Sequence, residues 1–169
     1  FVDYAGMDET GETQVGPMAG GLVFFAASNE GYYQGDVKKY PAADANVVAV
    51  ASIAADYRPA YYTNYGTWVD ISAPGGDPFF SDLENPFVGV GYGSPTAEVL
   101  STFVNGYGHM SGTSMACPHA SGVAALGLSY ANQLGIAMTA ETLKKYIYET
   151  ARDIDSYLKD DDYKYLPLQ

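Results

Sequence analysis

A serine placed between a glycine-rich turn and a long apolar helix is the feature that most constrains this chain. Residues 112–119 read Gly-Thr-Ser-Met-Ala-Cys-Pro-His, and small apolar residues follow as far as Leu126. This pattern predicts a helix that is buried on nearly all sides and carries Ser114 in its first turn. Unpaired N–H groups and the positive end of the helix dipole stabilise a developing anion there. Ser114 is therefore a candidate nucleophile.

A β-hairpin is predicted directly before this helix. Residues 98–103 and 107–111 alternate as strands do, and Asn105-Gly106 lies between them. Asn-Gly is the strongest short hairpin signal, because both central positions of a type I′ turn need a positive φ. We therefore expect Asn105 and Gly106 to form that turn.

Three further apolar segments predict a parallel sheet. Residues 22–27 and 47–53 are apolar without alternation, which is typical of strands covered on both faces. A shorter strand is expected at 69–71, ended by Pro74-Gly75-Gly76. A second helix is expected after Thr139, a capping residue, with Glu141 in its first turn. Polar loops or tails are expected in the segments 6–21, 76–96 and 152–169.

Composition excludes several classes of protein. The net charge of −12 argues against nucleic-acid binding, which needs a basic patch. No apolar stretch approaches the length of a membrane span. The single cysteine, Cys117, excludes an internal disulfide and is expected to be a small core residue. Acidic residues near both ends, at 8–12 and 153–162, predict a solvated surface. Their oxygen atoms are compatible with a structural calcium ion, which the sequence does not assign to a site. No other cofactor is expected.

The segment around Ser114 resembles the catalytic-serine motif of the subtilases, the subtilisin-like serine proteases. Three other segments are similar to this family in the same order: 22–31, which resembles the strand ending in the oxyanion-hole asparagine; 40–51; and 64–75, with Asn-Tyr-Gly and Ala-Pro-Gly. The resemblance implies an α/β fold, a three-layer sandwich with a mainly parallel sheet flanked by helices. Residues 1–169 would be the C-terminal part of one such peptidase domain, with its core at 22–151.

The resemblance also implies the site residues. Ser114 would be the nucleophile, and the Asn29 side chain would form the oxyanion hole with the Ser114 backbone N–H. The pocket for the substrate residue before the scissile bond would be lined by Ala26, Ala27, Ser28, Gly112 and Thr113. The family usually has glycine where this chain has Ser28, which puts the aim of Asn29 in question. Thr113 is also a candidate cap of the helix.

The other two members of the catalytic triad have no match in this chain. Its two histidines, His109 and His119, do not lie in the family's histidine motif. We expect His119 to pack along the helix and His109 to face solvent or bond within a loop. The catalytic Asp and His are expected on a missing N-terminal part of the same protein, which would be the partner of this chain. Peptides or proteins would be the substrate, and the resemblance implies a secreted or cell-envelope location.

Three functions are compatible with these features. The first is a serine endopeptidase that acts through an acyl-enzyme on Ser114, this chain alone being incomplete and inactive. The second is a non-catalytic subtilase-like module that has lost the Asp or the His and only binds a peptide or partner. The third, an unrelated α/β hydrolase, is disfavoured because its nucleophile elbow ends in glycine, where this chain has Ala116, and because no histidine follows His119.

Overall fold

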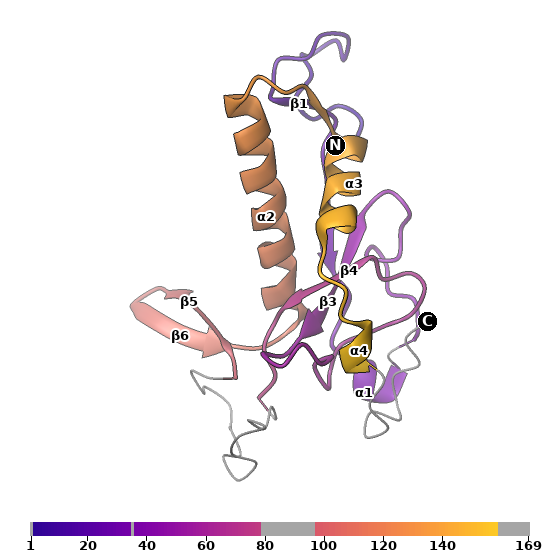
Figure 1. Ribbon diagram of the computed structural model, residues 1–169, viewed down its shortest axis with the longest axis vertical. Helices are drawn as coiled ribbons and strands as arrows, with labels where there is room; N and C mark the ends of the chain where they lie inside the picture. Colours follow the sequence, from indigo (N-terminus) through magenta and orange to yellow (C-terminus); the bar gives the residue numbers. More distant parts are fainter. Residues whose placement is uncertain (1, 35, 79–96, 159–169) are drawn as a thin grey trace.

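A small parallel sheet forms the centre of the structure (Figure 1). The computed structural model describes residues 2–34, 36–78 and 97–158. The sheet has the strand order β2-β3-β4, with β2 at Phe24–Ala26, β3 at Val48–Ile53 and β4 at Ile71–Pro74, all parallel. The central strand β3 is buried along its whole length. The predicted parallel sheet is thus confirmed, although β4 starts two residues later than expected and runs through the Ala-Pro pair.

Two helices lie beside this sheet. Helix α2, Thr113–Gln133, packs across all three strands, and helix α3, Ala140–Thr150, packs beside α2 (Figure 1). The described residues therefore supply the parallel sheet and a helical layer on one of its faces. The core between β3, β4 and α2 is made of small and β-branched side chains, namely Val48, Val50, Ala73, Ala116 and Ala120.

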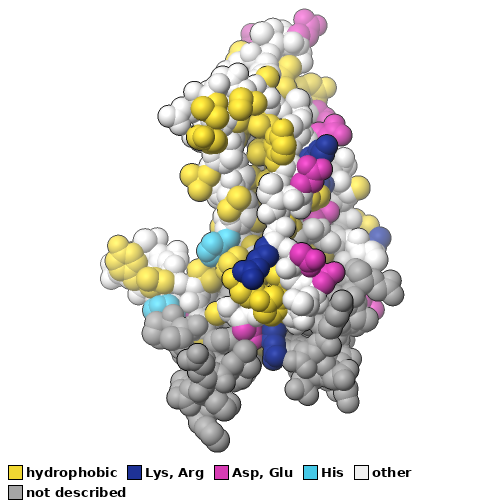
Figure 2. Space-filling model, in the orientation of Figure 1, with side chains coloured by type: hydrophobic (Ala, Val, Ile, Leu, Met, Phe, Trp, Pro, Cys, Tyr) yellow, Lys and Arg dark blue, Asp and Glu magenta, His cyan; other side chains and the backbone are white. Residues whose placement is uncertain are grey.

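Helix α2 is buried along one stripe only. Its buried residues are Thr113, Ala116, Ala120, Ala124 and Ala131, which recur mostly at helical spacing and let the helix approach the sheet closely. Larger apolar residues point away from the sheet: Val123, Leu126 and Tyr130 are 60%, 72% and 64% exposed. Figure 2 shows hydrophobic side chains gathered over the upper part of this helix. The expectation of a helix buried on nearly all sides is wrong for this chain by itself.

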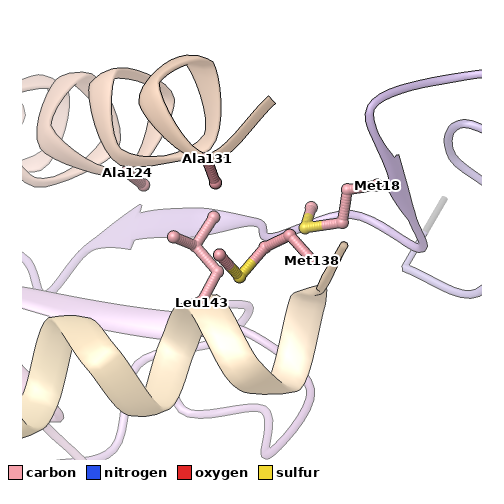
Figure 3. Packing of buried hydrophobic residues seen from close by; sticks show 5 residues of the cluster. All are labelled: Met18, Ala124, Ala131, Met138 and Leu143. Atoms are coloured by element: carbon pink, nitrogen blue, oxygen red, sulfur yellow. The ribbon is translucent and has the colours of Figure 1, made fainter. Parts of the chain in front are cut away.

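A second apolar cluster joins a segment near the start of the chain to α2, β7 and α3. Met18 lies in β1, Met18–Ala19, which pairs in parallel with β7, Met138–Thr139. Figure 3 shows the buried side chains of Met18, Ala124, Ala131, Met138 and Leu143 converging between α2 and α3. The end of the segment 6–21 is therefore strand and core rather than polar loop. Helix α3 begins as expected: the Thr139 hydroxyl oxygen accepts a hydrogen bond from the Thr142 N–H at 3.1 Å.

The hairpin before α2 is confirmed, but its turn is not the expected one. Strands β5, Val99–Phe103, and β6, Gly106–Met110, are antiparallel and extend away from the sheet (Figure 1). Phe103 pairs with Gly106, so Val104 and Asn105 form the loop. Of these residues only Gly106 has a positive φ, 148°. The type I′ prediction at Asn105-Gly106 is wrong, because the register places Gly106 in the strand.

The remaining described elements are short. Helix α1 spans Gly31–Gln34 and helix α4 spans Asp155–Leu158. The surface excursion expected at 76–96 and the tail at 152–169 lie largely outside the described residues, which omit 79–96 and 159–169. Within the described part, no helix combines the length and apolar character needed to cross a membrane.

Candidate active site

The sheet brings two predicted site residues together at one edge. Asn29 follows the carboxyl end of β2, and the turn before α2 is tied to the end of β4 by a hydrogen bond from the Gly112 N–H to the Gly75 carbonyl, 2.9 Å. Ligands of open parallel sheets bind where the carboxyl ends of the strands meet. Ser114 lies in the first turn of α2 and is exposed, so its hydroxyl is accessible.

Asn29 is bonded directly to the start of α2. Its Oδ1 accepts from the Thr113 N–H at 2.9 Å and from the Thr113 hydroxyl at 2.8 Å. Gly112 precedes the helix and has no side chain to cap it, so Asn29 supplies this cap from 84 positions away. The alternative that Thr113 caps the helix is wrong, since Thr113 is the first helical residue and donates to Asn29.

These bonds also define the orientation of the Asn29 amide. The Thr113 N–H can only donate, so the atom facing it must be the amide oxygen. The amide nitrogen therefore lies on the other side, beside the turn that carries Ser114: a Cβ placed on Gly112 would lie 3.3 Å from it. An N–H donor next to an accessible serine at a helix N-terminus is an arrangement that can stabilise an oxyanion.

A pocket of about 350 Å³ lies next to Ser114. Of the five predicted lining residues, Ala26, Ser28 and Thr113 do line it, together with Asn29. Ala27 is instead fully buried, with its N–H paired to the Val50 carbonyl, and Gly112 is buried in the turn. Sequence reasoning missed part of the wall, namely Phe25, Glu30, Lys39, Tyr40, Pro41 and Ala42.

The missed residues include an ion pair between the Glu30 carboxylate and the Lys39 ammonium. Glu30 follows Asn29 directly, so the sequence alone indicated that Glu30 lies near the site. Lys39 carried no such signal, because only the folding of the segment after β2 brings it to the pocket.

Ser28 occupies a backbone conformation that glycine adopts more easily. Its φ is +86°, in the left-handed region where a Cβ costs free energy. This is the position where the resemblance leads us to expect glycine, a residue that adopts such a conformation without the cost of a Cβ. The departure therefore places local backbone strain immediately before Asn29.

Neither histidine is hydrogen-bonded to Ser114 in the described structure. His119 is exposed, and its Nδ1 lies 2.8 Å from the Met115 carbonyl oxygen one turn earlier in α2. The His119 ring therefore lies along its own helix, as expected, but on a face that the described residues leave uncovered. His109 is half-buried in β6, opposite Leu100, rather than fully facing solvent.

Tyr62 holds the turn that follows β4. Its buried hydroxyl donates toward the Gly75 and Gly76 carbonyls, so the Ser52 hydroxyl, 2.8 Å away, donates to Tyr62. Burial raises the pKa of Tyr62 well above its usual range, with a smaller contribution from the Asp77 carboxylate. The phenol therefore remains a neutral donor at any physiological pH.

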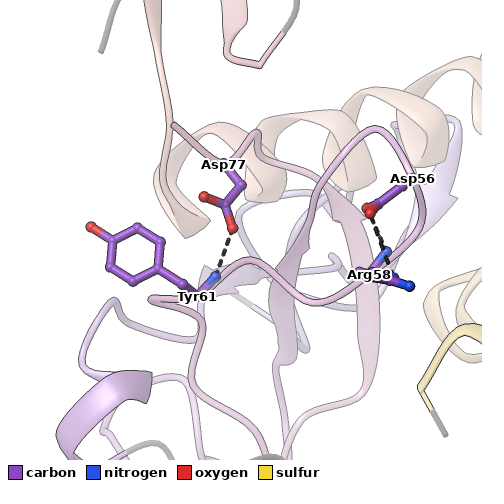
Figure 4. Close-up of polar contacts among 4 residues, drawn as sticks. All are labelled: Asp56, Arg58, Tyr61 and Asp77. Carbon is purple, nitrogen blue, oxygen red and sulfur yellow. Dashed lines mark hydrogen bonds and ion pairs between the residues drawn. The ribbon is translucent and has the colours of Figure 1, made fainter. Parts of the chain in front are cut away.

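Two carboxylates accept hydrogen bonds from the loop that carries Tyr62. Asp77 accepts the Tyr61 N–H at 2.9 Å, and Asp56 accepts the Arg58 N–H at 3.0 Å (Figure 4). The Arg58 guanidinium also lies 3.7 Å from Asp56. The Asp77 bond joins residues 56–64 to the segment that follows β4, whereas the Asp56 contacts close a turn within the loop.

Gly75 lies against both Ser52 and the turn at Gly112 that precedes α2, so a side chain at this position would disturb both. A Cβ at Gly75 would lie 2.1 Å from the Ser52 Oγ and 2.6 Å from the Gly112 carbonyl oxygen. Gly75→Ala is expected to lower the free energy of unfolding of the complete protein by about 1–3 kcal/mol, measured by urea denaturation, and to lower kcat, because the Gly112 turn must move.

The double variant Gly75→Ala/Ser52→Ala is the control for this prediction. It removes the nearer side-chain oxygen but leaves the Gly112 carbonyl in place. We expect only partial recovery, and full recovery of both stability and kcat would show that the clash does not reach the nucleophile turn.

Cys117 and the acidic residues that the structure describes carry no catalytic feature. Cys117 is half-buried against the cluster of β3, β4 and α2, as expected of a packing residue, and burial raises its pKa. Asp8 accepts hydrogen bonds from its own loop, chiefly from the Thr10 hydroxyl at 2.7 Å, which lowers the pKa of Asp8 to about 2. The described residues include no group of three or more His, Cys, Asp or Glu side chains placed to hold a metal. The acidic run at 160–162 lies outside them, and a structural calcium ion stays unassigned.

Curated relatives of this chain are serine proteases. The chain is 34% identical over 131 residues to the extracellular basic protease of Dichelobacter nodosus, covering 78% of this chain and 19% of that protein. It is 39% identical over 108 residues to the thermophilic serine proteinase of Bacillus sp. strain AK1, covering 63% and 21%. The chain thus spans about a fifth of the length of these relatives.

Solved structures lead to the same family. A protease from Pseudoalteromonas arctica PAMC 21717 is 31% identical with a TM-score of 0.63, over 82% of this chain and 38% of that one. A cold-adapted subtilisin-like serine proteinase is 27% identical with a TM-score of 0.58, over 80% and 40%. The fold of the described part is accordingly subtilisin-like α/β. The model of the subtilase family matches residues 4–165, and the chain therefore belongs to the subtilase family.

Proposed function

We propose that this chain is the nucleophile-bearing C-terminal part of a serine endopeptidase. The observation that carries the proposal is the Asn29 amide, whose oxygen is held by Thr113 while its nitrogen lies beside the turn that leads to Ser114. The pocket that opens next to Ser114 would take the substrate side chain before the scissile bond. Two relatives named as extracellular proteases support a secreted or cell-envelope location.

The reaction would proceed through an acyl-enzyme. The Ser114 Oγ attacks the carbonyl carbon of the scissile peptide bond and gives its proton to a histidine, which an aspartate orients. The negative charge that develops on the carbonyl oxygen accepts hydrogen bonds from the Asn29 amide nitrogen and the Ser114 backbone N–H. The tetrahedral intermediate collapses when the histidine protonates the leaving amine, and water then hydrolyses the ester on Ser114.

The histidine and the aspartate would lie on an N-terminal part that completes the domain. Strand β2 is an edge of the described sheet, and next to it a hollow of about 700 Å³ reaches Ser114. Apolar residues of β2 and α2 line this hollow, and Val123, Leu126 and Tyr130 continue the apolar surface along α2. Large exposed apolar surfaces and open strand edges are typical of sites that another segment covers. A segment docked there would present its histidine to Ser114.

The first prediction follows from the missing base. This chain alone is expected to hydrolyse no peptide and to react with no serine-directed phosphonate probe, because nothing removes the proton from Ser114. Addition of the N-terminal part, as a separate polypeptide or in the complete protein, should restore labelling, detected by intact-mass spectrometry. The complete protein carrying Ser114→Ala should stay unlabelled.

Two results would contradict this proposal in different ways. Strong labelling of Ser114 in the isolated chain would mean that the base lies within residues 1–169. A complete protein that folds and binds peptides but neither reacts with the probe nor hydrolyses them would support the non-catalytic module instead.

A further inference from the structure

We propose that Asn64 is a positioning residue that aims Asn29 at the start of α2. Asn64 would act by fixing the two peptide groups on either side of Asn29, without touching the substrate. The catalytic consequence rests on the proposed function, in which the Asn29 amide stabilises the oxyanion. The positioning of the Asn29 side chain by Asn64 does not depend on that function.

Asn64 is bonded to both neighbours of Asn29. Its backbone N–H donates to the Ser28 carbonyl at 3.1 Å, and its side-chain Oδ1 accepts from the Glu30 N–H at 2.8 Å. The Ser28 carbonyl belongs to the peptide group before Asn29, and the Glu30 N–H belongs to the peptide group after it. One residue therefore holds both peptide planes that determine the direction of the Asn29 side chain.

The loop at Asn29 needs such a restraint. Ser28 has a φ of +86°, a conformation that a residue with a Cβ leaves readily unless its surroundings hold it. Rotation of either flanking peptide would move the Asn29 Oδ1 away from the Thr113 N–H and hydroxyl, at 2.9 and 2.8 Å. Since oxyanion donors work by being preorganised, loss of this aim would lower the rate more than it lowers substrate binding.

Asn64 is itself anchored to the central strand. Its side chain is fully buried, and the preceding Thr63 hydroxyl oxygen accepts the Ser52 N–H of β3 at 2.9 Å. Hydrogen bonds and single steps along the chain thus connect β3, through Thr63 and Asn64, to the peptide groups around Asn29 and on to the first helical residue, Thr113. The positions joined are far apart in sequence, since Asn64 lies 34 positions after Glu30 and Thr113 lies 84 positions after Asn29.

Only the acceptor of the Asn64 amide is used. Its Nδ2 is buried and has no hydrogen-bond partner in the described structure. A side chain of the same shape that keeps an oxygen should therefore keep the clamp, and one that lacks it should release the clamp. This distinction makes the role of Asn64 separable from its packing.

The test compares Asn64→Leu with Asn64→Asp in the complete protein. In Asn64→Leu, which keeps the branched arrangement of four side-chain heavy atoms but has no acceptor, backbone amide hydrogen exchange should become about 10-fold faster at Glu30 and also at Thr113. The kcat should fall about 10-fold with little change in KM. Asn64→Asp offers an acceptor oxygen in either protonation state and should restore most of the protection at Thr113. Asn64→Ser, too short to reach Glu30, replaces the leucine variant if that one does not fold.

Thr63→Val is the matched control. It removes both buried hydrogen bonds of the neighbouring hydroxyl, the one accepted from the Ser52 N–H and the one donated to the Asn64 carbonyl at 3.2 Å, but leaves both bonds of Asn64 to the loop. It should lower thermal stability without accelerating exchange at Thr113. A second control is the Asn29→Ala background, in which Asn64→Leu should cause no further fall in kcat, because Asn64 would act only through Asn29.

Each outcome decides the proposal. Faster exchange at Glu30 with unchanged exchange at Thr113 would overturn it, since Asn64 would then only close its own loop. An equal loss of kcat with and without Asn29 would overturn its catalytic part. If the wild-type complete protein is inactive, the proposed function fails, while the exchange at Thr113 still decides whether Asn64 positions Asn29.

Discussion

Replacement of Ser114 by alanine is expected to abolish peptide hydrolysis by the complete protein. In the proposed mechanism the Ser114 hydroxyl forms the acyl-enzyme, so its loss should lower kcat by about 10⁶-fold, the magnitude known for subtilisin itself. The fold should be nearly unchanged, because Ser114 is exposed in the first turn of α2 and is not its cap. Steady-state kinetics and thermal unfolding measured on the same sample check both statements.

Ser121→Ala is the matched control for this variant. Ser121 lies seven positions further along α2 and lines the same hollow beside β2. Among the described residues its hydroxyl bonds only to the Pro118 carbonyl of its own helix, at 3.2 Å. Its kcat should stay close to that of the wild type. Hydrolysis that persists in Ser114→Ala at more than a trace would mean that another group is the nucleophile.

Asn29→Ala is expected to lower kcat by about 10²–10³ with KM nearly unchanged. This magnitude is the one known for the corresponding oxyanion-hole asparagine of subtilisin. The effect should fall on kcat because the oxyanion exists in the transition state and not in the bound substrate. Full activity in this variant, measured by kcat at saturating substrate, would remove Asn29 from the oxyanion hole.

Asn29→Asp separates the two roles of this side chain. An aspartate keeps the oxygen that accepts from Thr113, and its charge is favourable at a helix N-terminus, so stability should stay near that of the wild type. It lacks the amide N–H, so kcat should fall at least as far as in Asn29→Ala. If Asn29→Asp instead retained activity and Asn29→Ala lost it, the asparagine would serve only to cap α2.

Local patterns predicted much of the fold. The apolar runs at 22–27 and 47–53 became adjacent parallel strands, the alternating segments became β5 and β6, and Thr139 caps α3 through its own hydroxyl. Each of these strands and the helix cap depends on residues that are close together in the sequence, where side-chain type and backbone preference act together. The site residues were a different matter, since their roles came from the resemblance to the subtilases and stay a proposal.

The failures of prediction have one physical cause in common. The turn at Asn105-Gly106 was misplaced because register depends on how the whole of β5 meets β6. The burial of α2 was overestimated because an apolar composition does not say which neighbours are present. The Lys39 side chain in the pocket wall was missed because only tertiary folding brings it to Glu30.

The sequence by itself determined that Ser114 would lie in the first turn of a helix that follows a hairpin, and that parallel strands would precede both, because each of these elements is encoded by consecutive residues. Only the tertiary structure decided that Asn29 would cap that helix and that Asn64 would form hydrogen bonds with both peptide groups around Asn29. Hydrogen bonds between residues tens of positions apart have no local signal, since they exist only after the strands have paired in one order and brought their carboxyl ends to the same edge.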